Sequence, residues 1–221
     1  MADEHPNGVW IWRFLELRQD YMEKLVECGV GRVYLKVFDG NSDPMFWGHQ
    51  CTPEIVQHFK TNDIQVYGWG FHYGTSNVDE QVAAVQQALD CGIDGYVLDL
   101  EGHLKDPGTH PSLEKLLLDL RPLVPQGALG YTSYAHPGWH SEFPWKIVDK
   151  HCDIALPQIY FEGFTFAPTN EEEVQICLKA QQAAKLTKPS LPIWSSQPGA
   201  PHPSNAAKGW ASASSILAVR W

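Results

Sequence analysis

The chain has 221 residues, of which 43% are hydrophobic and 19% are charged. This balance is typical of a folded globular domain and excludes a disordered chain. A formal net charge of −10 argues against nucleic acids and anionic membrane surfaces as partners. We expect a monomer without nucleic-acid or membrane partners.

Five cysteines are scattered along the chain without a Cys-x-x-Cys pair. Their odd number and wide spacing predict free thiols in a reducing compartment, and they do not indicate a metal site. The N-terminus is polar and no signal peptide is visible, and no stretch is apolar enough to span a bilayer. Localisation stays open between a protein that is made in the cytoplasm and released and a trimmed secreted domain.

Strand-like and helix-like segments alternate along the whole chain. In order, we expect strand 8–14, helix 17–28, strand 33–38, a helix opened by the cap Thr52, strand 65–73, helix 77–91, strand 95–101, helix 112–123, strand 128–134, a short helix 143–151, strand 154–161, helix 170–186, strand 189–195, a weak helix 205–214 and strand 216–221. Seven strand–helix units and a closing strand predict one TIM-like (β/α)8 barrel over residues 1–221 that lacks or truncates its last helix. A doubly wound open sheet is the alternative, but no Gly-x-Gly-x-x-Gly follows the first strand.

The fourth expected strand carries two acids near its end. Side chains alternate along a strand, so Val97, Asp99 and Glu101 share one face. Burying two carboxylates beside apolar residues costs several kcal/mol unless they are paired or functional. A reactive pair is favoured over one that only caps the strand by binding backbone amides.

Polar and aromatic residues also gather where the other strands end, which is where barrel enzymes place their sites. A rim of acids, amides and flat rings suits carbohydrate recognition. The candidate substrate contacts are Asp39, His72, Tyr131, Gln158, Tyr160, Trp194 and Trp221.

Two of these positions, and two tryptophans at other strand ends, keep an alternative interpretation. Asp39 is either a second carboxylate across the barrel or a turn acid before Gly40. His72 is either a ligand or a structural hydrogen-bonding group, and Trp12 and Trp69 are as readily core residues as stacking surfaces.

The order of motifs resembles that of a known enzyme family. Asp94-Gly95-Tyr96-Val97-Leu98-Asp99-Leu100-Glu101 looks like the Asp-Gly-x-Asp-x-Asp-x-Glu strand of chitinase-type barrels, and still more like the Asp-x-Glu strand of glycoside hydrolase family 25, the muramidase-type lysozymes. Four other segments resemble strand motifs of that family, namely Val33-Tyr34-Leu35-Lys36-Val37-Phe38-Asp39-Gly40, Gly70-Phe71-His72-Tyr73, Gly130-Tyr131-Thr132-Ser133 and Ala155-Leu156-Pro157-Gln158-Ile159-Tyr160. One departure is clear, because the first strand lacks the family's aspartate.

The resemblance implies a glycosidase that cleaves β-linked N-acetylated sugars of peptidoglycan or chitin type without a cofactor. Glu101 would be the general acid/base with a raised pKa. Asp99 would stay ionised and orient the 2-acetamido group of the substrate, which acts as the internal nucleophile.

Two rival interpretations remain. Asp99, Glu101 and His103 stand at every second position and could serve a metal-dependent barrel enzyme. Alternatively, the missing first-strand acid fits a non-catalytic barrel that binds glycans.

Overall fold

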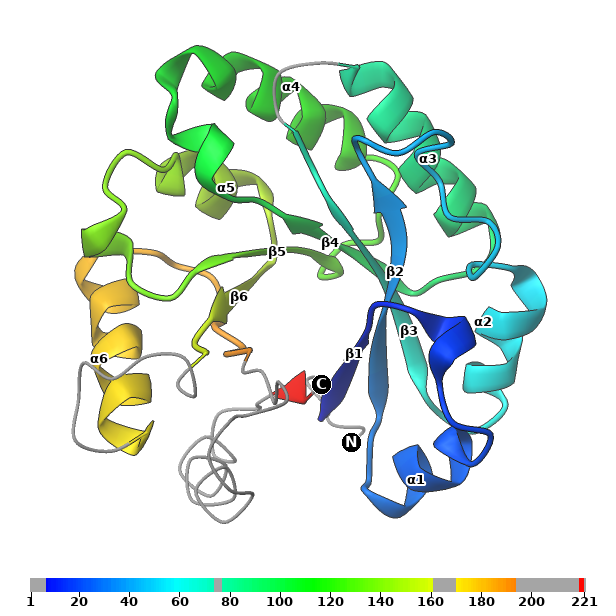
Figure 1. The fold of residues 1–221 in the computed structure, drawn as a ribbon. Helices are drawn as coiled ribbons and strands as arrows, with labels where there is room; N and C mark the ends of the chain where they lie inside the picture. The colour runs from blue at the N-terminus through cyan, green and yellow to red at the C-terminus, as the bar shows by residue number, and fades with distance from the viewer. Residues whose placement is uncertain (1–6, 74–76, 161–169, 194–218, 221) are drawn as a thin grey trace.

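The computed structural model describes residues 7–73, 77–160, 170–193 and 219–220. Six strands run parallel and curl into a barrel wall (Figure 1), namely β1 (Gly8–Ile11), β2 (Arg32–Asp39), β3 (Gln65–Phe71), β4 (Gly95–Asp99), β5 (Leu129–Tyr134) and β6 (Ile154–Gln158). The short strand β7 (Val219–Arg220) pairs in parallel with β1, which gives the order β6-β5-β4-β3-β2-β1-β7. The prediction of a (β/α) barrel is confirmed.

Helices cover the convex side of this wall (Figure 1). They are α1 (Tyr21–Glu27), α2 (Pro53–Lys60), α3 (Val78–Asp90), α4 (His110–Leu120), α5 (Trp145–His151) and α6 (Asn170–Ala183). The Thr52 hydroxyl accepts a hydrogen bond from the amide of Ile55, and Pro53 takes the first position of α2, as the expected cap requires.

The two ends of the predicted element list differ from the structure. The first strand ends at Ile11, and η1 (Phe14–Glu16) replaces its last residues. The expected strand 189–195 is reduced to two parallel bridges on the free edge of β6, Ser190 to Ala155 and Ile193 to Gln158. The expected helix 205–214 lies outside the described residues.

The strand register decides which side chains fill the barrel. Paired residues in neighbouring parallel strands point to the same side of the sheet. Trp10, Tyr34 and Tyr67 lie level with one another near the start of the strands, together with Gly95. A Cβ at Gly95 would stand 2.4 Å from the Tyr67 ring, so the absence of a side chain at Gly95 is what allows the aromatic rings to pack here.

The next two layers lead to the end of the barrel where β1–β6 finish, here called the mouth. Lys36, Trp69 and Val97 are level with Gly130 and Ile154. Above them come Asp39, Phe71 and Asp99, level with Thr132 and Leu156. The register therefore brings charged residues of β2 and β4 to the same height at the mouth.

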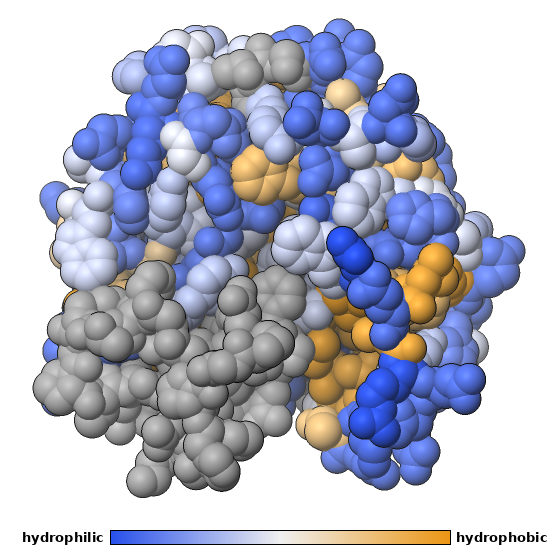
Figure 2. Space-filling model, viewed as in Figure 1, coloured by the Kyte–Doolittle hydropathy of each residue, from blue (hydrophilic) through white to orange (hydrophobic). Residues whose placement is uncertain are grey.

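Most of the surface in view is polar, in keeping with the net charge (Figure 2). Hydrophobic side chains gather on it around η1 and α1, where Leu15 is 70% and Val26 is 53% exposed. Within the described part of the chain, no helix has the length and apolar character needed to cross a bilayer.

Candidate active site

The acid pair predicted from the sequence lies at the end of β4. Asp99 is the last residue of the strand and is only 9% exposed, whereas Glu101 is half-buried just beyond it. Gln158, at the end of β6, donates from Nε2 to Asp99 Oδ1 at 3.2 Å and makes a longer contact of 3.5 Å with Glu101 Oε1. One amide group thus joins both carboxylates, and three of the predicted site residues come together.

Tyr134 adds an aromatic wall beside this pair. It is level with Gln158 in the sheet, and its hydroxyl would lie 3.1 Å from a Cβ at Gly102, so glycine keeps space open there. The ring stacks on His140 with centroids 3.7 Å apart. Burial and the negative charge of Glu101 raise the pKa of the Tyr134 phenol, so this ring is close enough to Glu101 to sense its charge.

The pKa of Asp99 differs from the expectation that this residue stays ionised. Burial, followed by the charge of Glu101, raises the pKa of Asp99 to about 8, although the Lys36 charge and the hydrogen bond from Gln158 oppose this rise. Two nearby carboxylates are costly to ionise together, and the more buried one keeps its proton longer. The prediction was wrong on this point because β4 carries Asp99 deeper into the barrel than its spacing from Glu101 suggests.

Asp39 reaches the mouth through an irregularity in β2. The pairing with β3 shifts between Lys36 and Phe38, so Lys36 pairs with Trp69 and Asp39 pairs with Phe71. In a regular strand, residues three apart face opposite sides, and the extra residue of a bulge removes that opposition. Lys36 Nζ therefore meets Asp39 Oδ2 at 3.0 Å inside the barrel.

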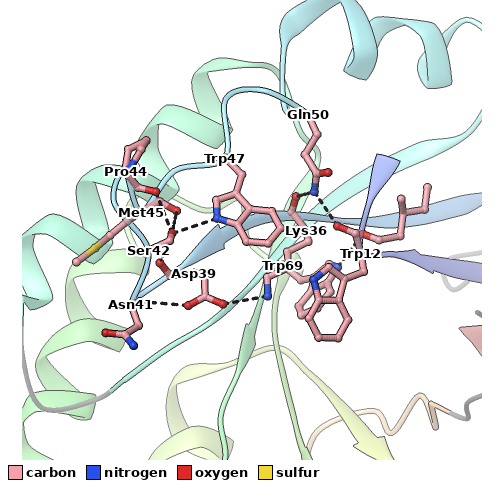
Figure 3. Close-up of polar contacts among 11 residues, drawn as sticks. Trp12, Lys36, Asp39, Asn41, Ser42, Pro44, Met45, Trp47, Gln50 and Trp69 are labelled. Atoms are coloured by element: carbon pink, nitrogen blue, oxygen red, sulfur yellow. Dashed lines mark hydrogen bonds and ion pairs between the residues drawn. The ribbon is translucent and has the colours of Figure 1, made fainter. Parts of the chain in front are cut away.

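The Lys36 ammonium group is enclosed by three indole rings (Figure 3). Nζ lies 4.6 Å from the ring centroid of Trp12, 4.7 Å from that of Trp47 and 5.1 Å from that of Trp69. The lysine side chain is only 4% exposed. Cation–π attraction in a desolvated setting contributes about 2 kcal/mol or more, so the three rings and Asp39 together offset part of the cost of burying this charge. We call Trp12, Trp47, Trp69 and Asp39 the Lys36 cage.

A second glutamine holds the walls of the cage in place (Figure 3). Gln50 Nε2 donates to the carbonyl oxygens of Trp12 at 2.9 Å and Lys36 at 2.6 Å. Trp47 Nε1 donates to Ser42 Oγ at 3.1 Å, which fixes the third ring. The cage therefore joins residues from the end of β1, from β2 and β3, and from the loop that leads to α2.

The structure places His72 away from the mouth. It is fully buried on the helix side of β3, and its nitrogens lie 2.8 Å from Gln81 Oε1 and 2.8 Å from Tyr96 Oη. Burial lowers the pKa of His72 to about 4, so the ring is neutral. Both ring nitrogens are engaged within the protein, so the interpretation of His72 as a structural hydrogen-bonding group holds. The prediction that His72 contacts the substrate was wrong.

Tyr131 is corrected for the same reason. It pairs with Leu98, so both face the helices and not the barrel interior, and its side chain is 2% exposed. Side chains alternate along β5, so Thr132, which pairs with Asp99, faces the barrel interior and Tyr131 does not.

The remaining predicted positions contribute less to the site. Tyr160 is half-buried and follows the end of β6 at Gln158, where strand alternation no longer fixes its direction. His103 Nε2 lies 2.6 Å from the carbonyl oxygen of His72, so this nitrogen already has a hydrogen-bond partner within the protein. Trp194 and Trp221 lie outside the described residues. Among the residues that are described, no three His, Cys, Asp or Glu side chains come together as a metal site would require.

Sequence reasoning missed the Lys36 cage as a site. The available signal was a lone lysine inside the apolar run Tyr34-Leu35-Lys36-Val37-Phe38, since a buried cation needs a partner. Trp47 and Gln50 carried no such signal, because they stand in a long loop whose path only the folded chain reveals.

No protein-family model and no curated protein sequence matches the chain. Solved structures do resemble it. A chitinase domain from Pyrococcus furiosus, crystallised with chito-oligosaccharides, matches with a TM-score of 0.67 and 12% identity over 99% of this chain and 85% of its own. The spore cortex-lytic enzyme SleL from Bacillus cereus matches with a TM-score of 0.61 and 12% identity over 86% of this chain. The match spans only about half of SleL, 51% of its length.

The same fold also occurs in a different enzyme class. A Toxoplasma gondii protein assigned as a deoxyribose-phosphate aldolase matches with a TM-score of 0.51 and 11% identity over 98% of this chain and 87% of its own. At such low identity these likenesses establish the barrel fold, and function has to be argued from the site.

Proposed function

We propose that the protein is a glycoside hydrolase that cleaves β-linked glycans of N-acetylated sugars, of peptidoglycan or chitin type. The observation that carries this proposal is the joined pair Asp99 and Glu101 at the mouth, with Gln158 contacting both carboxylates. The likeness of the fold to SleL and to a chitinase supports it, as does the order of motifs that resembles family 25.

Glu101 is the proposed general acid/base because it is the more exposed of the two carboxylates and therefore meets the glycosidic oxygen. The raised pKa of Asp99, about 8, keeps a proton on that carboxyl group near neutral pH. Substrate binding transfers that proton to Glu101, which leaves Asp99 as the carboxylate that accepts the acetamido N–H.

The bond changes follow from these positions. Glu101 donates its proton to the glycosidic oxygen while the bond from that oxygen to C1 breaks. The acetamido carbonyl oxygen of the substrate attacks C1, so the chain need not supply a nucleophile. Glu101 then removes a proton from water, whose oxygen attacks C1 and restores the acetamido group.

The test is Glu101→Gln on N-acetylated oligosaccharides in a reducing-end assay. We expect kcat to fall by about 10²- to 10⁴-fold while glycan binding survives, because the amide retains the shape but cannot donate the proton. Glu23→Gln on the exposed side of α1 is the matched control and should keep full activity. Absence of turnover by the unmutated protein on peptidoglycan and chitin-type glycans would refute the proposal.

One observation favours a second candidate, a glycan-binding barrel without catalysis. β1 ends without an acid, and Asp39 is engaged by Lys36, so neither supplies a free carboxylate opposite the pair. This candidate predicts glycan affinity without product, and Glu101→Gln should leave that affinity unchanged.

A further inference from the structure

Lys36 lies one layer below Asp99 in the interior of the barrel, on β2, and β3 stands between their two strands. Its layer, shared with Trp69 and Val97, is followed by the layer of Asp39, Phe71 and Asp99. The bulge in β2 puts Lys36 and Asp39 on the same inner face. Lys36, whose positive charge acts on Asp99, is thus part of a strand and is not carried by a surface loop.

The Lys36 cage holds this cation in one place. Long lysine side chains normally reach water, and fixing one in a single conformation loses rotamer entropy. Here three indole faces and one carboxylate surround Nζ, while Gln50 fixes the backbone of both Lys36 and Trp12. Plain core packing would be served better by an apolar residue of similar volume.

We propose that Lys36 is a positioning residue whose caged ammonium group is the counter-charge that allows the buried Asp99 to ionise during the reaction. The inference deepens the proposed function, because that mechanism requires Asp99 to release its proton while it remains buried. It extends to a residue that neither touches the substrate in that mechanism nor belongs to the acid pair.

The charges around Asp99 support this role. Glu101 beyond β4 and Asp39 on β2 both disfavour its ionised form, and Lys36 is the cation that favours it. The other neighbouring strands supply uncharged groups at this level, namely Phe71 from β3, Thr132 from β5 and Gln158 from β6. Removing Lys36 leaves two carboxylates acting on Asp99, opposed by the hydrogen bond from Gln158 without a positive charge.

The experiment is a ¹³C NMR titration of the Asp99 carboxyl group in the full chain, with its resonance identified by its loss in Asp99→Asn. The unmutated protein should titrate near pH 8. In Lys36→Met the midpoint should rise by about one pH unit or more, a tenfold gain in proton affinity. Lys36→Arg should restore the midpoint because it keeps the charge.

A second variant removes the dependence on how well Lys36→Met folds. Asp39→Asn deletes a negative charge and leaves the ammonium group, so the Asp99 midpoint should fall. Shifts of opposite sign in the two variants support the proposal. Unchanged midpoints, or shifts of the same sign, overturn it, since a purely structural ion pair would lower only the thermal stability.

Lys24→Met is the control for net charge, because Lys24 lies exposed on α1 and pairs with Glu27. It should leave the Asp99 midpoint in place. The titration needs no substrate, so its failure is distinguishable from failure of the proposed function. In an active enzyme, the alkaline fall of kcat/KM should move upward with the Asp99 midpoint in Lys36→Met.

Discussion

At the scale of single residues, the site depends on charges that are buried near one another. Asp99 is buried beside Glu101 and within reach of the Lys36 charge, and Gln158 links the two acids. A carboxyl group with a raised pKa destabilises the folded chain at pH values where the unfolded chain ionises it freely. Carboxyl groups with such perturbed pKa values cluster at functional sites, which is consistent with the role proposed for the pair.

Asp99→Asn should therefore stabilise the protein at pH 8 and not at pH 4. The pKa of Asp99 rises from 3.8 to about 8 on folding, so the folded state binds more protons between these values and its stability falls as pH increases through them. Asparagine does not titrate, and its side-chain oxygen still accepts from Gln158. The expected gain at pH 8 is on the order of a few kcal/mol.

Thermal unfolding at the two pH values measures this difference. Asp90→Asn, on the exposed end of α3, is the control and should show no such dependence. Equal destabilisation of Asp99→Asn at both pH values would contradict the placement of the Asp99 carboxyl in a desolvated site.

At the scale of elements, small residues in the strands make room for large ones. Gly95 begins β4 inside the aromatic layer, where a Cβ would stand 2.4 Å from Tyr67 Cε1 and 2.7 Å from the carbonyl oxygen of Ala128. Neither atom belongs to the end of a flexible side chain, so the strand itself would have to move.

Gly95→Ala should lower the free energy of unfolding by about 1–3 kcal/mol, because the added methyl group overpacks the aromatic layer. Gly29→Ala is the comparison, because Gly29 has φ of +64° and a Cβ added there would meet no atom within 4 Å, which leaves only backbone strain of about 1 kcal/mol. Urea denaturation of both variants separates the two causes. A smaller loss in Gly95→Ala than in Gly29→Ala would show that the aromatic layer can relax.

At the scale of the whole molecule, the fold shields most of the cysteines. All five are free, as the sequence predicted; Cys28 is exposed and Cys91 is partly so, whereas Cys51, Cys152 and Cys177 are buried. Burial raises the pKa of the three buried thiols, which suppresses their reactive thiolate form.

Native alkylation at pH 7.5 should therefore modify Cys28 first and Cys91 more slowly. The three buried thiols should react only after unfolding, when mass spectrometry should find five modified cysteines. Rapid modification of Cys152, which is buried between α5 and β6, would indicate that the barrel wall opens there.

The sequence by itself determined the class of fold and the acid pair. Alternating apolar strands and amphipathic helices predict the barrel, because hydrophobic periodicity is local in the chain. Asp99 and Glu101 were identified for the same reason, since two acids on one face of a buried strand are conspicuous at any position. Gln158 followed from its place at a strand end.

Only the tertiary structure decided how charge is distributed at the mouth. The bulge in β2 turns Asp39 to the face of Lys36, and strict alternation along the sequence would have separated them. The cage needs Trp12, Trp47 and Trp69 from three distant segments, and His72 and Tyr131 face the helices because of strand register. Proton affinity depends on burial and on neighbours from other strands, so the raised pKa of Asp99 follows from packing and not from its spacing along the chain.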